Sequence, residues 1–327
     1  MVVTEAGLIK PASRAGIRIS ASASSGSEAL MRFAFDDPRP GFDRIGLELL
    51  GGDQVEEHWQ IPAKAESGRH GDLRFCRADH LLYIACECAD DGHTDPAGMT
   101  EMLYGKILAL AKLQGCPTLI RAWNFMPAIN HGEDDNERYR RFCLGRARAL
   151  EAAGIGDREL CAGTAIGGDD PHLRVMVLAG RHGGINIENP RQVSAYRYPR
   201  IYGPRSPSFA RATAIGQPDG SAFLMISGTA SVVGHRTLHE GDREAQTAEI
   251  IVNLETVLKE SAQRLRRPAL GEFGAHSLLR AYVRHAEHWP QVREQLRSAW
   301  PDTPVIGFRG DICRSDLLVE IEAVTSG

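Results

Sequence analysis

The chain has 327 residues and a formal net charge of −4, which is enough length for two domains or one large one. The negative balance argues against a nucleic-acid-binding protein, which usually carries a basic patch, although it leaves room for a locally basic pocket. No apolar run approaches the roughly 18 residues of a membrane span, and residues 1–25 lack the charged start and apolar core of a secretion signal. We therefore expect a soluble, cytoplasmic protein with no membrane partner.

The seven cysteines are scattered along the chain, and only Cys86 and Cys88 lie close together. On a strand these two would share one face, but no second pair is present to complete a zinc site. We predict free thiols in a reducing compartment and no bound metal. His235 and His239 flank a glycine turn without an evident third ligand, so we interpret them as loop residues.

The first half of the chain alternates predicted strands and helices, after a stretch at 1–30 in which only short strand fragments are predicted. Apolar residues between Pro96 and Gly115 recur at spacings of three and four, which indicates a helix bounded by these two residues. A second helix is predicted over 137–153. The predicted strands are 47–55, 63–76, 80–88, 118–125, 162–168 and 173–179.

A Gly/Pro/Tyr-rich connection over 180–202 leads into the second half. A long helix is predicted over 244–265, because its apolar residues form one stripe, and a shorter one over 290–298. Residues 227–231 are predicted to form a tight glycine turn at the end of a strand. The predicted strands are 222–229, 276–283, 304–308 and 317–323.

The two halves share the order helix, strand, helix, strand, which indicates an internal repeat. Residues 119–123 (LIRAW) match residues 278–282 (LLRAY) almost letter for letter. Two further pairs of segments correspond in order: 102–107 with 245–250, and 137–142 with 291–296. Coincidence between short amphipathic pieces is the alternative, but the matching order favours duplication. Two α+β units would bury their exposed sheet faces against each other and leave a ligand cleft between them.

The last patterned segment, 317–323, reads as a strand with Glu320 and Glu322 on one face. If that face is desolvated, the pKa of a carboxyl there rises, as a general acid requires. The alternative is a solvated face on an edge strand, and the pattern alone leaves both readings open.

Four short stretches of the second half carry a family pattern: 246–247 (QT), 253–254 (NL), 280–283 (RAYV) and 318–323 (LVEIEA). Together they resemble the RidA/YjgF superfamily, whose fold is a chorismate-mutase-like α+β unit. The resemblance implies two tandem units, each a mixed sheet with helices packed on one face. A divergent N-terminal half would span 1–180, and the C-terminal half with the catalytic strand would span 181–327. In many members the first glutamate of the terminal strand is the catalytic carboxylate, here Glu320.

The fuller pattern resembles the chorismatases, a branch of this superfamily with an added N-terminal half. The matching stretches are 123–130, 202–205 (YGPR), 207–212 (PSFARA), 226–235 (ISGTASVVGH) and 311–314 (DICR). Chorismatases remove the enolpyruvyl group of chorismate without a metal or organic cofactor. The resemblance therefore implies chorismate as substrate, pyruvate as one product, no cofactor, and an active site between the halves.

Cys313 bears on the second product, because one chorismatase type has a cysteine seven residues before the terminal glutamate. That type forms 3-hydroxybenzoate, and some members also form 4-hydroxybenzoate. The other type hydrolyses chorismate to a dihydroxycyclohexadiene carboxylate. Cys313 lies seven residues before Glu320, which favours the benzoate-forming type. The substrate arginine of RidA deaminases is replaced by Val305, so imine hydrolysis is not expected.

Chorismate is a dianion with a vinyl ether, so its enzyme needs an acid, cations for two carboxylates and a dry pocket. We assign the acid to Glu320 and a supporting role to Cys313, with arginine pairing bidentately with carboxylates. Tyrosine hydroxyl and backbone N–H groups would supply further donors. The predicted substrate-binding residues are Tyr202, Arg205, Arg211, Gly228, Thr229 and Ala230.

Several alternatives stay open at this point. Arg205 and Arg211 could be surface or structural cations, Cys313 a buried thiol without chemistry, and Trp123 a core residue. The function could also be that of a non-catalytic binder of small carboxylates or of a metal-dependent hydrolase. A duplicated unit can be self-sufficient, which slightly favours a monomer over a homo-oligomer.

Overall fold

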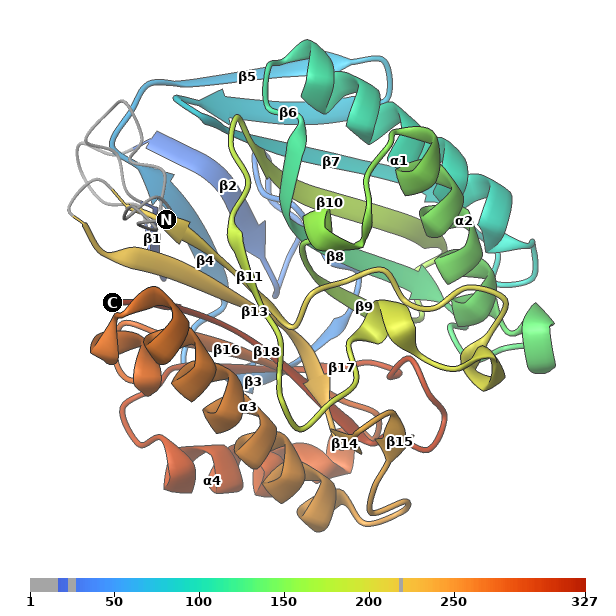
Figure 1. The fold of residues 1–327 in the computed structure, drawn as a ribbon, viewed down its shortest axis with the longest axis vertical. Helices are drawn as coiled ribbons and strands as arrows, with labels where there is room; N and C mark the ends of the chain where they lie inside the picture. Colours follow the sequence, from blue (N-terminus) through green and yellow to red (C-terminus); the bar gives the residue numbers. More distant parts are fainter. Residues whose placement is uncertain (1–16, 23–27, 218–219) are drawn as a thin grey trace, which may run out of the picture.

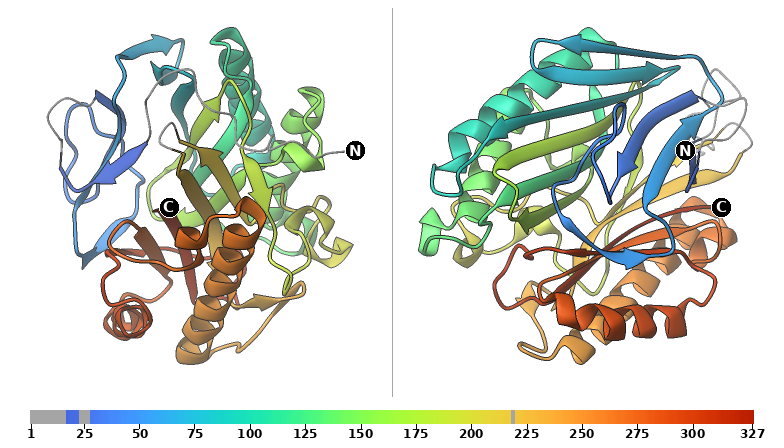
Figure 2. Two further views of the ribbon diagram at one scale, coloured as in Figure 1. Left: turned by 60° about the vertical axis from the view of Figure 1, so that its left-hand side comes forward. Right: turned by 180° about the vertical axis from the view of Figure 1, so that it is seen from behind.

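The computed structural model describes residues 17–22, 28–217 and 220–327 (Figure 1). The predictions for 1–16 and 23–27, which include most of the expected N-terminal strand fragments, lie outside these residues. The described chain is of the α+β class, with two large mixed sheets and two helices on the outer side of each (Figures 1 and 2). None of the helices in the described ranges is long and apolar enough to cross a membrane.

The first large sheet has the strand order β5-β6-β7-β10-β8-β9. All its neighbouring pairs are antiparallel except β8 and β9, which are parallel. Helices α1 (Pro96–Leu113) and α2 (Arg138–Ala152) pack on its outer face through one apolar cluster. The strands are β5 (Ala65–His70), β6 (Leu73–Ala78), β7 (Leu81–Ala89), β8 (Thr118–Pro127), β9 (Ala162–Gly168) and β10 (His172–Gly180).

The second large sheet has the order β11-β12-β13-β18-β16-β17-β3. Helices α3 (Arg243–Leu265) and α4 (Trp289–Ala299) cover its outer face through a separate apolar cluster. The strands are β3 (Glu48–Gly52), β11 (Ile185–Ile187), β12 (Ala212–Gly216), β13 (Ala222–Ala230), β16 (Leu278–Val283), β17 (Val305–Arg309) and β18 (Val319–Ser326).

The strand orders confirm the internal repeat. Strands β5, β6, β7, β10, β8 and β9 correspond one for one to β11, β12, β13, β18, β16 and β17, and the parallel pair falls at the same place in each sheet. The matched segments LIRAW and LLRAY lie on the equivalent strands β8 and β16. The domain division at residue 180 stays a prediction, and β3 from the first half pairs with β17 of the second.

A third sheet, β1-β4-β2, was not predicted as such. Its strands are β1 (Arg18–Ser20), β2 (Glu28–Ala34) and β4 (Glu56–Ile61), and a short hairpin of β14 (Val232–Val233) and β15 (Arg236–Thr237) lies apart from it. The inner faces of the large sheets and this third sheet share one apolar core, in which Trp123 is fully buried. Trp123 is therefore a core residue.

Two local predictions need correction, and one alternative left open by the sequence is excluded. The predicted strand 63–76 is a hairpin of β5 and β6, because Gly71 takes a positive φ of 60° at the turn between them. The predicted turn at 227–231 is a bulge inside the sheet, where the pairing register of β13 against β18 shifts between Ile226 and Thr229. The terminal strand β18 is not an edge strand, since it lies between β13 and β16.

Candidate active site

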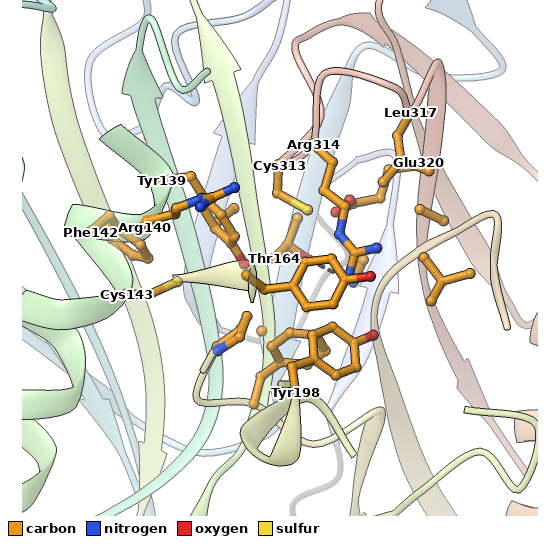
Figure 3. A pocket seen from close by; sticks show the side chains of 18 of the residues that line it. Tyr139, Arg140, Phe142, Cys143, Thr164, Tyr198, Cys313, Arg314, Leu317 and Glu320 are labelled. Carbon is orange, nitrogen blue, oxygen red and sulfur yellow. Dashed lines mark hydrogen bonds between the residues drawn. The ribbon is translucent and has the colours of Figure 1, made fainter. Parts of the chain in front are cut away.

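A cavity of about 290 Å³ lies between the two halves of the chain (Figure 3). Residues of α2 and β9 line it from the first half. The loop 192–211, strand β13 and the stretch 313–320 line it from the second half. This volume is near the lower end of the range of small-molecule pockets, so the cavity suits a compact ligand.

Glu320 projects from β18 into this cavity and is only 5% exposed. It lies opposite Ala230 of β13 and Tyr282 of β16, and no described residue forms a hydrogen bond with its carboxyl group. Burial, and then the negative charge of Glu322, raise the pKa of Glu320 to about 8, although Arg121 and Arg211 oppose the shift. The side chain therefore holds its proton near neutral pH, as a general acid must.

Glu322 is buried on the same face but is fully engaged by other side chains. Its carboxylate accepts hydrogen bonds from Arg121 Nη2 at 2.5 Å, Trp123 Nε1 at 3.1 Å and Arg280 Nη1 at 3.2 Å. Arg280 also binds both carboxylate oxygens of Glu57, at 2.6 Å each. This network joins all three sheets, so the two glutamates of the terminal strand have different environments: Glu322 is paired and Glu320 is not.

Gly228 makes room for the Glu320 carboxyl. A Cβ atom at residue 228 would lie 1.9 Å from Glu320 Oε1, far inside van der Waals contact. The bulge in β13 places this glycine against Glu320, and its N–H donates to Thr164 Oγ1 at 3.0 Å. A side chain at residue 228 would therefore displace the carboxyl from its present position.

Three arginines line the cavity without an ion pair to any described carboxylate: Arg146, Arg211 and Arg314. Arg211 Nη2 donates to the Tyr198 hydroxyl at 2.7 Å, and Arg146 Nη1 donates to the Ser208 carbonyl at 2.6 Å. These partners are neutral, and the buried Nε atoms of Arg146 and Arg211 have no partner. The positive charges are thus available to an anionic ligand.

Tyr202 lines the cavity mouth and organises Arg314. Its ring lies under the Arg314 guanidinium, whose central carbon is 4.0 Å from the ring centre, and its hydroxyl is 3.2 Å from His235 Nδ1. Arg314 Nη1 also donates to the His235 carbonyl at 3.0 Å. The guanidinium is therefore held in one orientation beside Cys313 (Figure 3).

Two predicted binding residues lie outside the cavity. Arg205 pairs with Glu151 of α2 on the outer surface, and 41% of its side chain is exposed. Thr229 is buried beside the cavity, where its hydroxyl donates to the Ser227 carbonyl at 2.9 Å. Arg205 is close to Tyr202 in sequence, but the chain turns between them and directs Arg205 outward. Gly228 and Ala230, by contrast, line the cavity wall.

Cys313 also lines the cavity, at the turn that precedes β18. Burial, followed by the neighbouring Glu320, raises the pKa of the Cys313 thiol, so the sulfur carries its proton at neutral pH. Cys143 of α2 faces the same space, and burial raises its thiol pKa to about 12. No group of three or more His, Cys, Asp or Glu side chains within the described ranges is arranged to hold a metal ion.

Comparison with known proteins places this geometry in a family. The family model described as "Chorismatase FkbO/Hyg5-like, N-terminal" matches residues 57–179. A protein named 3-hydroxybenzoate synthase from Streptomyces hygroscopicus is 38% identical over 297 residues, which cover 87% of this chain and 86% of that protein. The chain belongs to the chorismatase family.

Two further members of the chorismatase family support this assignment. A protein named chorismatase, also from Streptomyces hygroscopicus, is 37% identical over 278 residues, covering 83% of this chain and 79% of that protein. The solved crystal structure of a chorismatase is 33% identical and superposes with a TM-score of 0.80, covering 95% of this chain and 98% of that one. The likeness therefore extends over the whole fold.

The cavity residues of this chorismatase-family chain that were not predicted include Tyr139, Arg146, Thr164 and Arg314. The sequence pattern could have identified Arg146 as a buried arginine, because it stands between Phe142 and Leu150 at helical spacing. Both of those residues are buried. A charged residue in the apolar stripe of a helix must find a polar partner or a ligand. Thr164 gave no signal, since its neighbours come from distant parts of the chain.

Replacing Gly228 by alanine is expected to lower kcat by about 100-fold or more, within the range of general acid catalysis. The new methyl group would push the Glu320 carboxyl aside, and the flexible side chain would move more easily than the backbone. Steady-state kinetics and a thermal melt would measure the result. Gly105→Ala, on the open face of α1 with nothing within 4 Å of the added atom, is the control and should keep full activity. Unchanged kcat in Gly228→Ala would contradict the contact.

Proposed function

We propose that this chain releases pyruvate from chorismate and forms 3-hydroxybenzoate as the second product. The observation that carries the proposal is Glu320, a buried and unpaired carboxyl whose pKa is raised to about 8, in a cavity with three arginines free to bind an anion. The names of relatives at 37% and 38% identity point to the same substrate and product.

The substrate would be held by charge. Chorismate carries one carboxylate on its ring and one on the enolpyruvyl group, and Arg146, Arg211 and Arg314 all line the cavity. Two of them can each meet one carboxylate, and the third offsets the remaining negative charge. Because Glu320 is mainly neutral at pH 7, it adds no repulsion to a bound dianion.

Glu320 would then protonate the terminal methylene carbon of the enolpyruvyl group. The vinyl ether becomes an oxocarbenium ion, which is open to attack by an oxygen nucleophile. In the benzoate-forming route the neighbouring ring hydroxyl is that nucleophile, and it forms a second C–O bond to the oxocarbenium carbon. The ring becomes aromatic when the ether-bearing ring carbon loses its proton to the Glu320 carboxylate and the C–O bond at the neighbouring ring carbon breaks. The remaining hemiketal then collapses, which leaves the ether oxygen on the ring as the 3-hydroxyl group and releases pyruvate. Chorismate divides into 3-hydroxybenzoate and pyruvate without consuming water, and the proton given by Glu320 returns from the ring. Aromatisation makes the last step favourable.

The alternative outcome is attack by water, which gives a dihydroxycyclohexadiene carboxylate and pyruvate. Cys313 favours the benzoate route in our proposal, since its protonated thiol occupies the wall next to Glu320 and can shape the space around the ring or relay a proton. A neutral thiol is a weak donor and a weak acceptor, so it can serve either role.

Cys313→Ala is expected to shift the products away from 3-hydroxybenzoate while pyruvate release continues. Removal of the thiol takes away a proton relay and opens space that water can enter. Chromatographic analysis of the aromatic and diene products would give the ratio. Cys143→Ala, which removes a second thiol from the same cavity, is the matched control and should keep the wild-type ratio. The same product ratio in Cys313→Ala would remove Cys313 from the mechanism.

The direct test is to incubate the purified protein with chorismate, assay pyruvate, and identify the second product by chromatography. Pyruvate with 3-hydroxybenzoate supports the proposal, and pyruvate with the diene supports the hydrolase. Binding of chorismate without pyruvate release would indicate a non-catalytic binder. Activity that a chelator abolishes would indicate a metal-dependent hydrolase instead.

A further inference from the structure

Thr164 of β9 occupies a central place in the cavity wall and is only 3% exposed. Its hydroxyl oxygen accepts a hydrogen bond from Arg121 Nη2 at 2.5 Å and another from the Gly228 N–H at 3.0 Å. A hydroxyl group has two acceptor positions and one proton. Both acceptor positions are therefore occupied, and the group can act toward anything else only as a donor.

The donor proton of Thr164 has no acceptor among the described residues. The main chain around it is held firmly, because its carbonyl accepts from Asn124 Nδ2 at 2.8 Å, and Asn124 in turn accepts from the Tyr104 hydroxyl at 2.7 Å. Arg121 is 1% exposed and bound to Glu322, so it cannot swing into the cavity itself. It instead polarises the Thr164 hydroxyl, because hydrogen bonds in a chain strengthen one another.

The position of Thr164 relative to Glu320 determines which group of a bound substrate could accept a hydrogen bond from the Thr164 hydroxyl. Gly228 separates the two side chains: its N–H bonds to Thr164, and its α-carbon faces the Glu320 carboxyl. Both side chains also line the same cavity, so a substrate that receives a proton from Glu320 occupies the space that Thr164 borders. In chorismate the group that receives the proton is the enolpyruvyl methylene carbon, and the ether oxygen and the carboxylate oxygens are two and three bonds away.

We propose that the Thr164 hydroxyl donates a hydrogen bond to an oxygen of the enolpyruvyl group, which makes Thr164 a substrate-binding residue of this site. The inference rests on the proposed function. The donor would place the methylene carbon against Glu320, and it would do so without adding a charge to the cavity. The network Glu322–Arg121–Thr164 then links the buried ion pairs to the substrate, which gives Glu322 an effect on binding although it does not reach the cavity.

The kinetic test compares wild type, Thr164→Ser and Thr164→Val. Serine keeps the hydroxyl and is expected to stay within about threefold of the wild-type kcat/KM, whereas valine should lose about tenfold or more, as for a hydrogen bond to a charged or strongly polar group. Equal kcat/KM in the serine and valine variants would overturn the inference. A wild type that releases no pyruvate would reject the proposed function itself, which is a separate result.

A binding measurement separates contact with substrate from an effect on Glu320. In Glu320→Gln the acid is absent, so the affinity for chorismate can be measured by calorimetry without turnover. Adding Thr164→Val to this variant should raise the Kd of chorismate about tenfold if Thr164 touches the substrate. An unchanged Kd would overturn the inference. If the valine variant does not fold, Thr164→Cys takes its place, since a thiol keeps the size and weak acceptor but is a poor donor.

Discussion

Glu320→Gln is expected to reduce pyruvate release from chorismate by about 100- to 10,000-fold, the usual contribution of a general acid. Glutamine matches the size and the neutral charge of the protonated carboxyl but has no proton to give to carbon. Because the charge in the cavity is unchanged, chorismate should bind with nearly wild-type affinity. A coupled pyruvate assay would measure the rate, and calorimetry would measure the affinity.

Glu101→Gln is a suitable control for this experiment, since Glu101 is a half-exposed carboxylate that pairs with Arg148 on the surface of the helices. Its activity should equal that of wild type. Retention of full activity by Glu320→Gln would remove Glu320 as the acid and leave the raised pKa as a mere consequence of burial. Loss of both turnover and binding would instead point to a role in holding the substrate.

The same group should set the pH dependence of the wild-type rate. The pKa of Glu320 is raised from its ordinary 4.5 to about 8, and in the proposed mechanism the protonated form is the active one. The rate should therefore stay high below this pKa and fall about tenfold per pH unit above it. A rate that rises as the pH passes through 8 would show that a base, not Glu320 acid, limits the reaction.

The repeated part of the fold could be predicted because its pattern is local. Helices α1 and α3 show apolar stripes at helical spacing, and β8 and β16 carry nearly the same letters. The third sheet could not be predicted from the sequence, as its strand β4 shows. Four of the six residues in its sequence EEHWQI are polar, yet five of the six are buried. Glu57 can be buried because Arg280, 223 residues further along the chain, neutralises it. A pairing at that separation leaves no local pattern.

The candidate site likewise contains residues that could be predicted from the sequence and residues that could not. Glu320 and Cys313 could be predicted because a short terminal stretch of the family pattern contains both, and Arg211 because the stretch PSFARA contains it; all three line the cavity. Arg205 lies outside the cavity, since nearness in sequence to Tyr202 does not say on which side of a turn a side chain points, and its contact with substrate stays a prediction. Thr164 was not predicted because its hydrogen-bond partners Arg121 and Gly228 lie 43 and 64 residues away in the chain.

The buried ion pairs behind the site should matter most for stability, and Arg280→Met tests this. Arg280 is 4% exposed and is the partner of both Glu57 oxygens and of Glu322. Methionine would fill similar space but leave two buried carboxylates short of a cation. We expect the free energy of unfolding to fall by about 3–5 kcal/mol, the usual cost of removing one partner of a buried pair. Urea unfolding with linear extrapolation would measure it.

Arg293→Met provides the matched control, because Arg293 pairs with Asp53 at 2.9 Å on the surface, where 33% of its side chain is exposed. Solvent screens such a pair, so the control should cost about 1 kcal/mol or less. Adding Glu57→Gln to Arg280→Met removes one of the unpaired charges and should recover part of the lost stability. If the single and double variants are equally unstable, the loss comes from packing around residue 280. If Arg280→Met loses no more free energy of unfolding than the surface control, the network joins the sheets without stabilising them. Its role would then be to hold Arg121 and Glu322 in place behind Glu320.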